Sequence, residues 1–235
     1  MKDSLTIAVP LYNEEDGIKN LHKKLIPIFE KLTSERVTNI ILVNDGSTDN
    51  TEKLLFDYFS KIINLKIIKH DTNLNLGGFL NTISNNCETD LVVFIDSDCT
   101  FDPEYIFDML ELLDKETDII NGSPYHPDGK IDGEKKSRLV ISYLCNFIYR
   151  KITKINSYTF TSIFKLYRMN SIKNIQINNT GFVSVAELFV RSVQNGSTVK
   201  EFPCTLSIRQ IGESKIHILS AVIDHLKFML RILTR

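Results

Sequence analysis

The segment that decides the fold reads DLVVFIDSDCTFDPEY over residues 90–105. An unbroken apolar run ends in the polar triplet Asp96-Ser97-Asp98, and Asp102-Pro103 then precedes an amphipathic stretch. Apolar runs without alternation are typical of strands covered on both faces, as in a parallel sheet. Aspartate followed by proline is a typical helix start. The segment therefore predicts a buried strand, a turn that carries two carboxylates, and a helix.

The same strand–helix unit recurs through the first 121 residues. Apolar runs predict strands at 5–9, 39–43, 65–68, 90–95 and 118–120. Segments of helical period lie between them, at 15–33, 49–61, 76–86 and 103–115. This repetition predicts an α/β fold with a mostly parallel central sheet flanked by helices, and ligands at the carboxyl ends of its strands.

The pattern changes after Gly122. Residues 123–136 are polar and rich in turn formers, and they predict a loop. Beyond them we expect helices at 136–153, 182–194 and 216–233, and strands at 163–168 and 198–206. No linker marks a boundary, so we expect a single domain over 1–235, with one half at 1–121 and an elaborated second half at 122–235.

The composition excludes several classes of protein. Of 235 residues, 43% are hydrophobic and 24% charged, as in a globular protein. The four cysteines form no CxxC pair, which argues against a disulfide framework or a zinc site. We find no signal peptide and no run of about 18 apolar residues. The expectation is a cytoplasmic protein that meets a membrane only at its surface.

The net charge of −1 conceals an uneven distribution. Residues 1–129 contain 23 acidic and 11 basic side chains, whereas residues 130–235 contain 6 and 17. This asymmetry predicts two kinds of partner. Nucleic acid is disfavoured, because the basic residues share the second half with apolar helix faces. A dinucleotide-dependent dehydrogenase is disfavoured too, because no GxGxxG follows the first strand.

Three strand ends carry polar motifs that would meet at one edge of the sheet: PLYNEE at 10–15, NDGSTD at 44–49 and DSD at 96–98. Tyr12 can stack on a base, and Asp45 can accept a hydrogen bond from it. Asp96 and Asp98, on the same side of an extended segment, can bind a ribose hydroxyl and Mg²⁺ or Mn²⁺. Each motif alone also fits a turn or a helix cap. Together, each after an apolar run, they favour a nucleotide site.

On these motifs the sequence resembles family 2 glycosyltransferases with the GT-A fold, through LTIAVPLYNEE, ILVNDGSTDNT, NLNLGG and VVFIDSDCTFDPE. Its second half is similar to the branch that includes dolichol-phosphate mannosyltransferases and bacterial polyprenyl-phosphate glycosyltransferases. The segments that carry this similarity are SRLVISYLCNFIYR, FTSIFKLYRMNSI, GFVSVAELFVRSVQNG and EFPCTLSIRQIGESK. The resemblance covers nearly the whole chain.

The resemblance implies a site for a nucleoside-diphosphate sugar. It places five residues around the base and ribose: Pro10, Tyr12, Glu14, Val43 and Asp45. It places Asp96, Ser97 and Asp98 beside the ribose and diphosphate, with Asp98 as the principal ligand of Mg²⁺ or Mn²⁺ and Asp96 as another. Where the family often has a glutamine ligand, this chain has Thr100, a weaker oxygen donor.

The resemblance also implies two phosphate-binding elements. In RQIGESK, Arg209 and Lys215 match the family's donor-phosphate clamp, where arginine binds bidentately and lysine acts as a point charge. A solvated basic turn is the alternative interpretation of this segment. The implied acceptor-phosphate site comprises Arg138 and Ser142, one helical turn apart, with the further residues Asn146 and Ser214.

Glu187 lies in the apolar segment FVSVAELFV, where an unpaired carboxylate is costly. One interpretation is a buried acid paired with Arg168 or Arg191. The other, implied by the family position, places Glu187 beside the sugar or the acceptor. It would then be the general base for a hydroxyl acceptor, whereas a phosphomonoester, with a second pKa of about 6, needs no strong base.

The last segment, HILSAVIDHLKFMLRILTR at 217–235, predicts a basic amphipathic helix. Its broad apolar face, with Lys227, Arg231 and Arg235 beside it, suits an anionic membrane surface. The alternative is a helix that packs on the core with solvated cations.

The expected function is an inverting, metal-dependent transfer of a sugar from a UDP- or GDP-linked donor to a polyprenyl (dolichyl or undecaprenyl) phosphate. The reaction would take place at the cytosolic face of a membrane. Two departures from the family concern the acceptor: Pro124 replaces an arginine and Thr159 replaces an aspartate. With Thr100, they keep two alternatives open, namely transfer to a saccharide hydroxyl in surface-polysaccharide assembly and a nucleotide-sugar-binding protein with weak or no activity. The oligomeric state stays open.

Overall fold

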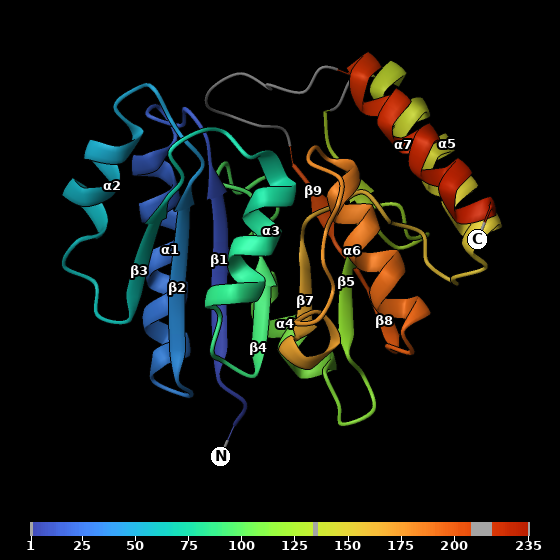
Figure 1. Cartoon of the computed structure of the whole chain (residues 1–235). Coiled ribbons are helices and arrows are strands. Elements are labelled where there is room, and N and C mark those ends of the chain that lie inside the picture. Colours follow the sequence, from blue (N-terminus) through green and yellow to red (C-terminus); the bar gives the residue numbers. More distant parts are fainter. Residues whose placement is uncertain (1, 134–135, 208–217, 235) are drawn as a thin grey trace.

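A seven-stranded sheet runs through the molecule (Figure 1). The computed structural model describes residues 2–133, 136–207 and 218–234. The strands, in the spatial order β3-β2-β1-β4-β7-β5-β8, are β3 Leu65–Lys69, β2 Thr38–Asn44, β1 Leu5–Leu11, β4 Leu91–Phe94, β7 Lys165–Arg168, β5 Ile119–Ser123 and β8 Val199–Pro203. All neighbours are parallel except β7, which is antiparallel to β4 and to β5.

Helices cover both faces of this sheet (Figure 1). One face packs against α1 Ile18–Thr33, α2 Thr51–Phe59 and α4 Tyr105–Leu112. The other packs against α3 Asn75–Asn86 and α6 Val183–Gln194. Two further helices, α5 Lys136–Thr153 and α7 Ile218–Leu233, contact each other, and α7 also contacts α6. A short 3₁₀ helix, Met169–Ser171, follows β7.

The fold class predicted from the sequence is confirmed, and most elements lie within a few residues of their expected positions. Two segments differ. The strand expected at 198–206 is divided, because β8 ends at Pro203, which has no N–H for the ladder. The chain then forms β9, Thr205–Leu206, which pairs with β6, Lys130–Ile131, inside the expected loop 123–136.

The antiparallel direction of β7 determines which loops lie together at one edge of the sheet. The carboxyl ends of the parallel strands β1, β2 and β4 lie at this edge (Figure 1). Because β7 runs the other way, its first residue, Lys165, pairs with Phe94 at the end of β4. The segment before β7, residues 161–164, is therefore brought beside the polar turn after β4.

Candidate functional site

A cavity of about 550 Å³ lies at this edge of the sheet. Nine residues that the sequence singled out line it: Pro10, Tyr12, Glu14, Asp45, Asp96, Ser97, Asp98, Thr100 and Ser142. They come from four separate segments of the chain: the end of β1 with the loop after it, the loop after β2, the turn after β4, and α5. The structure thus assembles the predicted nucleotide side chains with part of the predicted acceptor side chains in one space.

The turn after β4 holds the two predicted metal ligands in a defined conformation. Cys99 N donates to Asp96 O at 3.1 Å, and Thr100 N donates to Asp98 Oδ1 at 3.1 Å. Cys99 adopts φ +50°, an uncommon value for a residue with a side chain, and it is buried. Burial raises the pKa of its thiol to about 12. Next along the chain, Phe101 stacks on Phe164, with ring centroids 4.9 Å apart.

The chemistry of this turn fits Mg²⁺ or Mn²⁺. Asp96 and Asp98 both line the cavity and are both half-buried. Across residues 2–133, 136–207 and 218–234, no cluster of three or more His, Cys, Asp or Glu could by itself hold a metal ion. A pair of carboxylates agrees with the usual magnesium site, in which one or two carboxylates act together with substrate phosphates and water.

Asp45 is fixed by partners that the sequence did not single out. Its Oδ1 accepts from Leu74 N at 2.8 Å and lies 2.6 Å from His70 Nδ1. His70 Nε2 in turn lies 2.7 Å from Thr82 Oγ1 on α3. His70 stands one residue after β3, so it is a strand-end residue like the others, but no recognisable motif marks it.

The loop before α3 and the first residue of that helix supply two further cavity residues that the sequence did not assign, Asn73 and Asn75. Both lie in the NLNLGG motif at 73–78, which was the available signal. Asn75 has φ +58°. Gly77 N donates to Thr180 O at 2.7 Å, and a Cβ at Gly77 would lie 2.1 Å from Asn179 O. Only glycine permits this approach of two backbones.

The NDGSTD motif also has a structural role, because it binds the loop after β1. Thr48 N donates to Asn13 Oδ1 at 2.7 Å, and Asn13 N donates to Ser47 Oγ at 2.9 Å. Glu14 N donates to Thr51 Oγ1 at 2.7 Å. The loops that carry Tyr12 and Asp45 are thereby held together as one unit.

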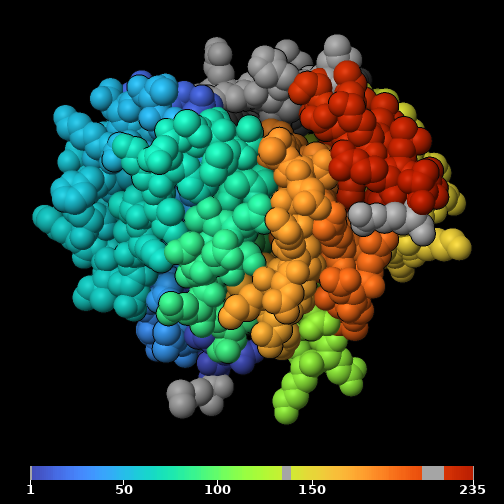
Figure 2. Space-filling view, in the orientation of Figure 1, coloured from blue at the N-terminus to red at the C-terminus, as the bar shows by residue number. Residues whose placement is uncertain are grey.

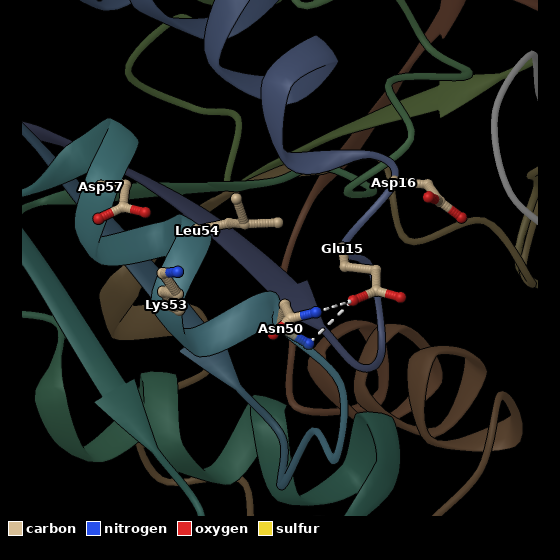
Figure 3. Close-up of a pocket in the computed structure, with 6 residues that line it drawn as sticks. All are labelled: Glu15, Asp16, Asn50, Lys53, Leu54 and Asp57. Atoms are coloured by element: carbon tan, nitrogen blue, oxygen red, sulfur yellow. Dashed lines mark hydrogen bonds between the residues drawn. The ribbon is translucent and has the colours of Figure 1, made fainter.

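A shallow hollow beside this unit is shown in Figure 3. Glu15 Oε2 accepts from Asn50 N at 3.0 Å and from Asn50 Nδ2 at 2.9 Å, which ties the start of α2 to the loop after β1. The carboxylates of Asp16 and Asp57 lie at opposite ends of the hollow (Figure 3). These contacts stabilise the loops, and we assign no ligand to them.

The other end of the cavity is mainly apolar. Its walls come from the loop after β5, the segment before β7, and the helices α5 and α7; the lining residues include Pro124, Tyr125, Leu139, Ile141, Cys145, Ile163, Ala221, Val222 and His225. The two positions that depart from the family meet here. Thr159 Oγ1 lies 2.8 Å from Ser123 Oγ, directly before Pro124, so an uncharged pair occupies this place.

Two predicted residues in the described part of the chain, Asn146 and Val43, do not line the cavity. Asn146 is buried; its Oδ1 accepts from Phe160 N at 2.7 Å, so it fixes the segment before β7. Val43 is buried in the sheet. Three predicted residues lie outside the described residues: Arg209, Ser214 and Lys215. The backbone of Arg138 belongs to α5, but its side chain is also outside the described part of the structure.

The structure does not bring Glu187 to the cavity. The carboxylate is fully buried, and its Oε2 accepts from Asn178 N at 3.2 Å, Asn179 N at 2.9 Å and Asn179 Nδ2 at 2.7 Å. Its Oε1 lies 2.7 Å from Arg191 Nη2, an ion pair within α6. Arg168, the other cation considered, pairs with Asp3 instead. Glu187 thus fixes the segment 178–180, against which the backbone of Gly77 packs.

The class of protein follows from a family comparison. The chain matches the model of glycosyl transferase family 2 over residues 6–176. It belongs to this family, as the motifs indicated.

Individual relatives agree with this class. The chain is 27% identical over 216 residues to a dolichol-phosphate mannosyltransferase of Pyrococcus furiosus, a match that covers 90% of this chain and 59% of the relative. It is 24% identical over 219 residues to a polyprenol monophosphomannose synthase of Mycolicibacterium smegmatis, covering 89% and 80%. The chain therefore spans less than two thirds of the length of the Pyrococcus relative.

Solved structures confirm the fold as GT-A. Glucosyl-3-phosphoglycerate synthase of Mycobacterium tuberculosis with phosphoglyceric acid matches with a TM-score of 0.74 at 14% identity, covering 99% of this chain and 80% of that one. The same enzyme with Mn²⁺, UDP and glucosyl-3-phosphoglycerate matches with a TM-score of 0.71 at 14% identity, covering 97% and 78%.

Proposed function

We propose that this protein transfers a sugar, with inversion, from a nucleoside-diphosphate sugar to a polyprenyl phosphate. The observation that carries the proposal is a single cavity with two unlike ends. One end presents Tyr12, Asp45, Asp96 and Asp98, and the other is walled by apolar side chains of α5 and α7. A polar donor and a lipid acceptor require such a pair of surfaces. The names of the two relatives, both polyprenyl-type mannosyltransferases, support the same acceptor class.

In the proposed reaction, Tyr12 stacks on the base and Asp45, oriented by His70, accepts a hydrogen bond from it. Asp96 and Asp98 would hold Mg²⁺ or Mn²⁺, which would supply positive charge to offset that of the departing diphosphate. We assign Arg209 and Lys215 to the same diphosphate. A phosphate oxygen of the acceptor forms the new bond to the anomeric carbon as the bond to the diphosphate breaks. No proton has to leave the attacking group, because a phosphomonoester is largely ionised at neutral pH.

A transfer assay tests this function. The protein is incubated with Mn²⁺, UDP- or GDP-linked sugars, and one of three additions: farnesyl phosphate in detergent, a saccharide panel, or none. We expect a glycosylated farnesyl phosphate, identified by mass spectrometry. Glycosylation of a saccharide alone would instead support the second candidate, which the uncharged Ser123–Thr159 pair beside Pro124 favours. Donor binding without any product would identify a binding protein.

We further propose that the α5–α7 surface lies on an anionic membrane at its cytosolic face. Nine of the fifteen exposed large hydrophobic side chains of the described residues form this surface: Val140, Ile141, Tyr143, Leu144, Phe147, Ile223, Leu226, Leu230 and Leu233. The helix α7 lies at the outside of the molecule (Figure 2). Its exposed cations Lys227 and Arg231 suit anionic lipids. No helix in the described part of the chain is long and apolar enough to span a bilayer.

Flotation with vesicles of phosphatidylcholine and phosphatidylglycerol tests the membrane surface. We expect the protein to float with the vesicles and the double substitution Leu144→Glu with Leu226→Glu to lower the bound-to-free ratio by roughly tenfold or more, since each buried leucine contributes about 1.5–3 kcal/mol. The matched control is Ile63→Glu, which is 81% exposed and lies between α2 and β3. Equal flotation of the double variant and the control would contradict this role of the surface.

A further inference from the structure

His225 lies at the apolar end of the cavity, on the side of α7 that faces the protein. It is 8% exposed and lines the cavity together with Ala221 and Val222 from the preceding turn of α7. Ser142 and Cys145 of α5 line the same end. Among the lining residues that the structure describes, His225 is the only basic side chain. It is therefore the one described lining side chain at this mainly apolar end that contains an imidazole ring.

A buried tyrosine fixes the orientation of this imidazole. Tyr149 OH lies 2.8 Å from His225 Nδ1, and the two rings meet edge to face at 79°. Tyr149 is fully buried and stacks on Phe160, with centroids 5.4 Å apart. The ring of His225 is thus held by a side chain that has no freedom to move away.

The same contact determines which ring nitrogen carries the proton. Burial raises the pKa of Tyr149, so the phenol keeps its hydrogen. A buried tyrosine hydroxyl needs an acceptor, and His225 Nδ1 is the one that the described residues offer. When the phenol donates to Nδ1, the single proton of a neutral imidazole is on Nε2. No residue in the described part of the chain hydrogen-bonds Nε2. Its N–H group is therefore available to donate to a ligand in the cavity.

We propose that His225 Nε2–H donates a hydrogen bond to a phosphate oxygen of the acceptor, and that Tyr149 is the positioning residue that maintains this donor. The inference rests on the proposed function and names the recognised group of the acceptor as a phosphomonoester. A saccharide hydroxyl acceptor would need a general base to remove its proton, which Nε2 cannot do while it carries a hydrogen.

The charge state of this end of the cavity agrees with the proposal. Burial lowers the pKa of His225 to about 4, although the neighbouring Asp224 acts in the opposite direction. Burial raises the pKa of the Cys145 thiol to about 12. At neutral pH both groups are uncharged. A neutral donor can orient a phosphate without neutralising the oxygen that attacks the sugar.

Calorimetric binding of farnesyl phosphate in detergent, without donor, tests the proposal. We expect His225→Phe, which keeps a ring but removes the donor, to weaken binding roughly 10- to 100-fold, as loss of a hydrogen bond to a charged group does. His225→Gln, which keeps an N–H donor, should restore most of the affinity. Tyr149→Phe should weaken binding roughly 2- to 10-fold. The affinity for UDP and GDP with Mn²⁺ should stay the same in all three.

Binding of three ligands, namely farnesol, farnesyl phosphate and inorganic phosphate, distinguishes the possible results. Farnesol lacks the phosphate, so its binding should not change in His225→Phe; an equal loss for farnesol would overturn the proposal. Equal affinity of wild type and His225→Phe for farnesyl phosphate would overturn it too. Inorganic phosphate that binds as tightly as farnesyl phosphate, and depends on His225, would support phosphate recognition from a soluble source. Because binding is measured without donor, His225-dependent binding with no transfer refutes the proposed function and leaves this inference intact.

Discussion

Asp98→Asn is expected to abolish sugar transfer, with kcat lower by about 10²–10³-fold or more, the cost of losing one group that stabilises charge in a transition state. The amide can still accept the hydrogen bond from Thr100 N that shapes the turn. It cannot supply the negative charge that a divalent cation requires. The fold should therefore persist while metal binding is lost. Steady-state rates with farnesyl phosphate and the active donor measure the effect.

The matched control for this experiment is Asp108→Asn, an exposed carboxylate on α4 away from the cavity lining. We expect its rate to equal that of the wild type. The loss in Asp98→Asn should be accompanied by the loss of Mn²⁺-dependent donor binding, and its melting temperature without ligand should be unchanged. An Asp98→Asn variant with wild-type turnover would contradict the assignment of Asp98.

Glu187→Ala is expected to lower the free energy of unfolding by about 3–5 kcal/mol, the usual cost of breaking a buried ion pair by removing one partner. The substitution leaves Arg191 without its carboxylate and removes the acceptor of three N–H groups from Asn178 and Asn179. Urea unfolding followed by circular dichroism measures the change. The exposed Glu111→Ala on α4 should change the free energy by less than about 0.5 kcal/mol.

A second substitution, Glu187→Gln, distinguishes a structural role of this carboxylate from a catalytic one. Glu187→Gln keeps an oxygen for the N–H groups of Asn179 but loses the ion pair, so we expect an intermediate loss of stability. Its kcat, measured below the unfolding transition, should stay within about threefold of wild type, because the group does not line the cavity. A large fall in kcat with unchanged stability would show that Glu187 acts on the substrate.

The strands were predictable because their apolar runs report burial on both faces. The direction of β7 was not, since the run SIFKLYR reports burial and contains no information on direction. The two-residue strands β6 and β9 are too short to give a period. The divided strand near Pro203 had a local signal, because a proline interrupts a ladder wherever its N–H would be needed.

The polar end of the cavity was predictable because motifs at strand ends converge in any parallel sheet. His70 carries no such motif, and its role, like that of Asn73 in NLNLGG, depends on the path of the loop after β3. For Glu187, the i, i+4 spacing to Arg191 was a signal for the ion pair that the structure shows. His225 could not be identified from the sequence, because its contact with Tyr149 depends on how α7 packs against α5.

The central claim, that the cavity holds a nucleoside-diphosphate sugar together with a divalent metal, is tested most directly by a thermal-shift series. UDP, GDP and their sugars are each added with and without Mn²⁺. We expect one nucleotide series to raise the melting temperature by roughly 5–10 °C at about 100 times its Kd, only with Mn²⁺, and not in Asp98→Asn. No stabilisation by any of these nucleotides in the presence of Mn²⁺ would contradict the account.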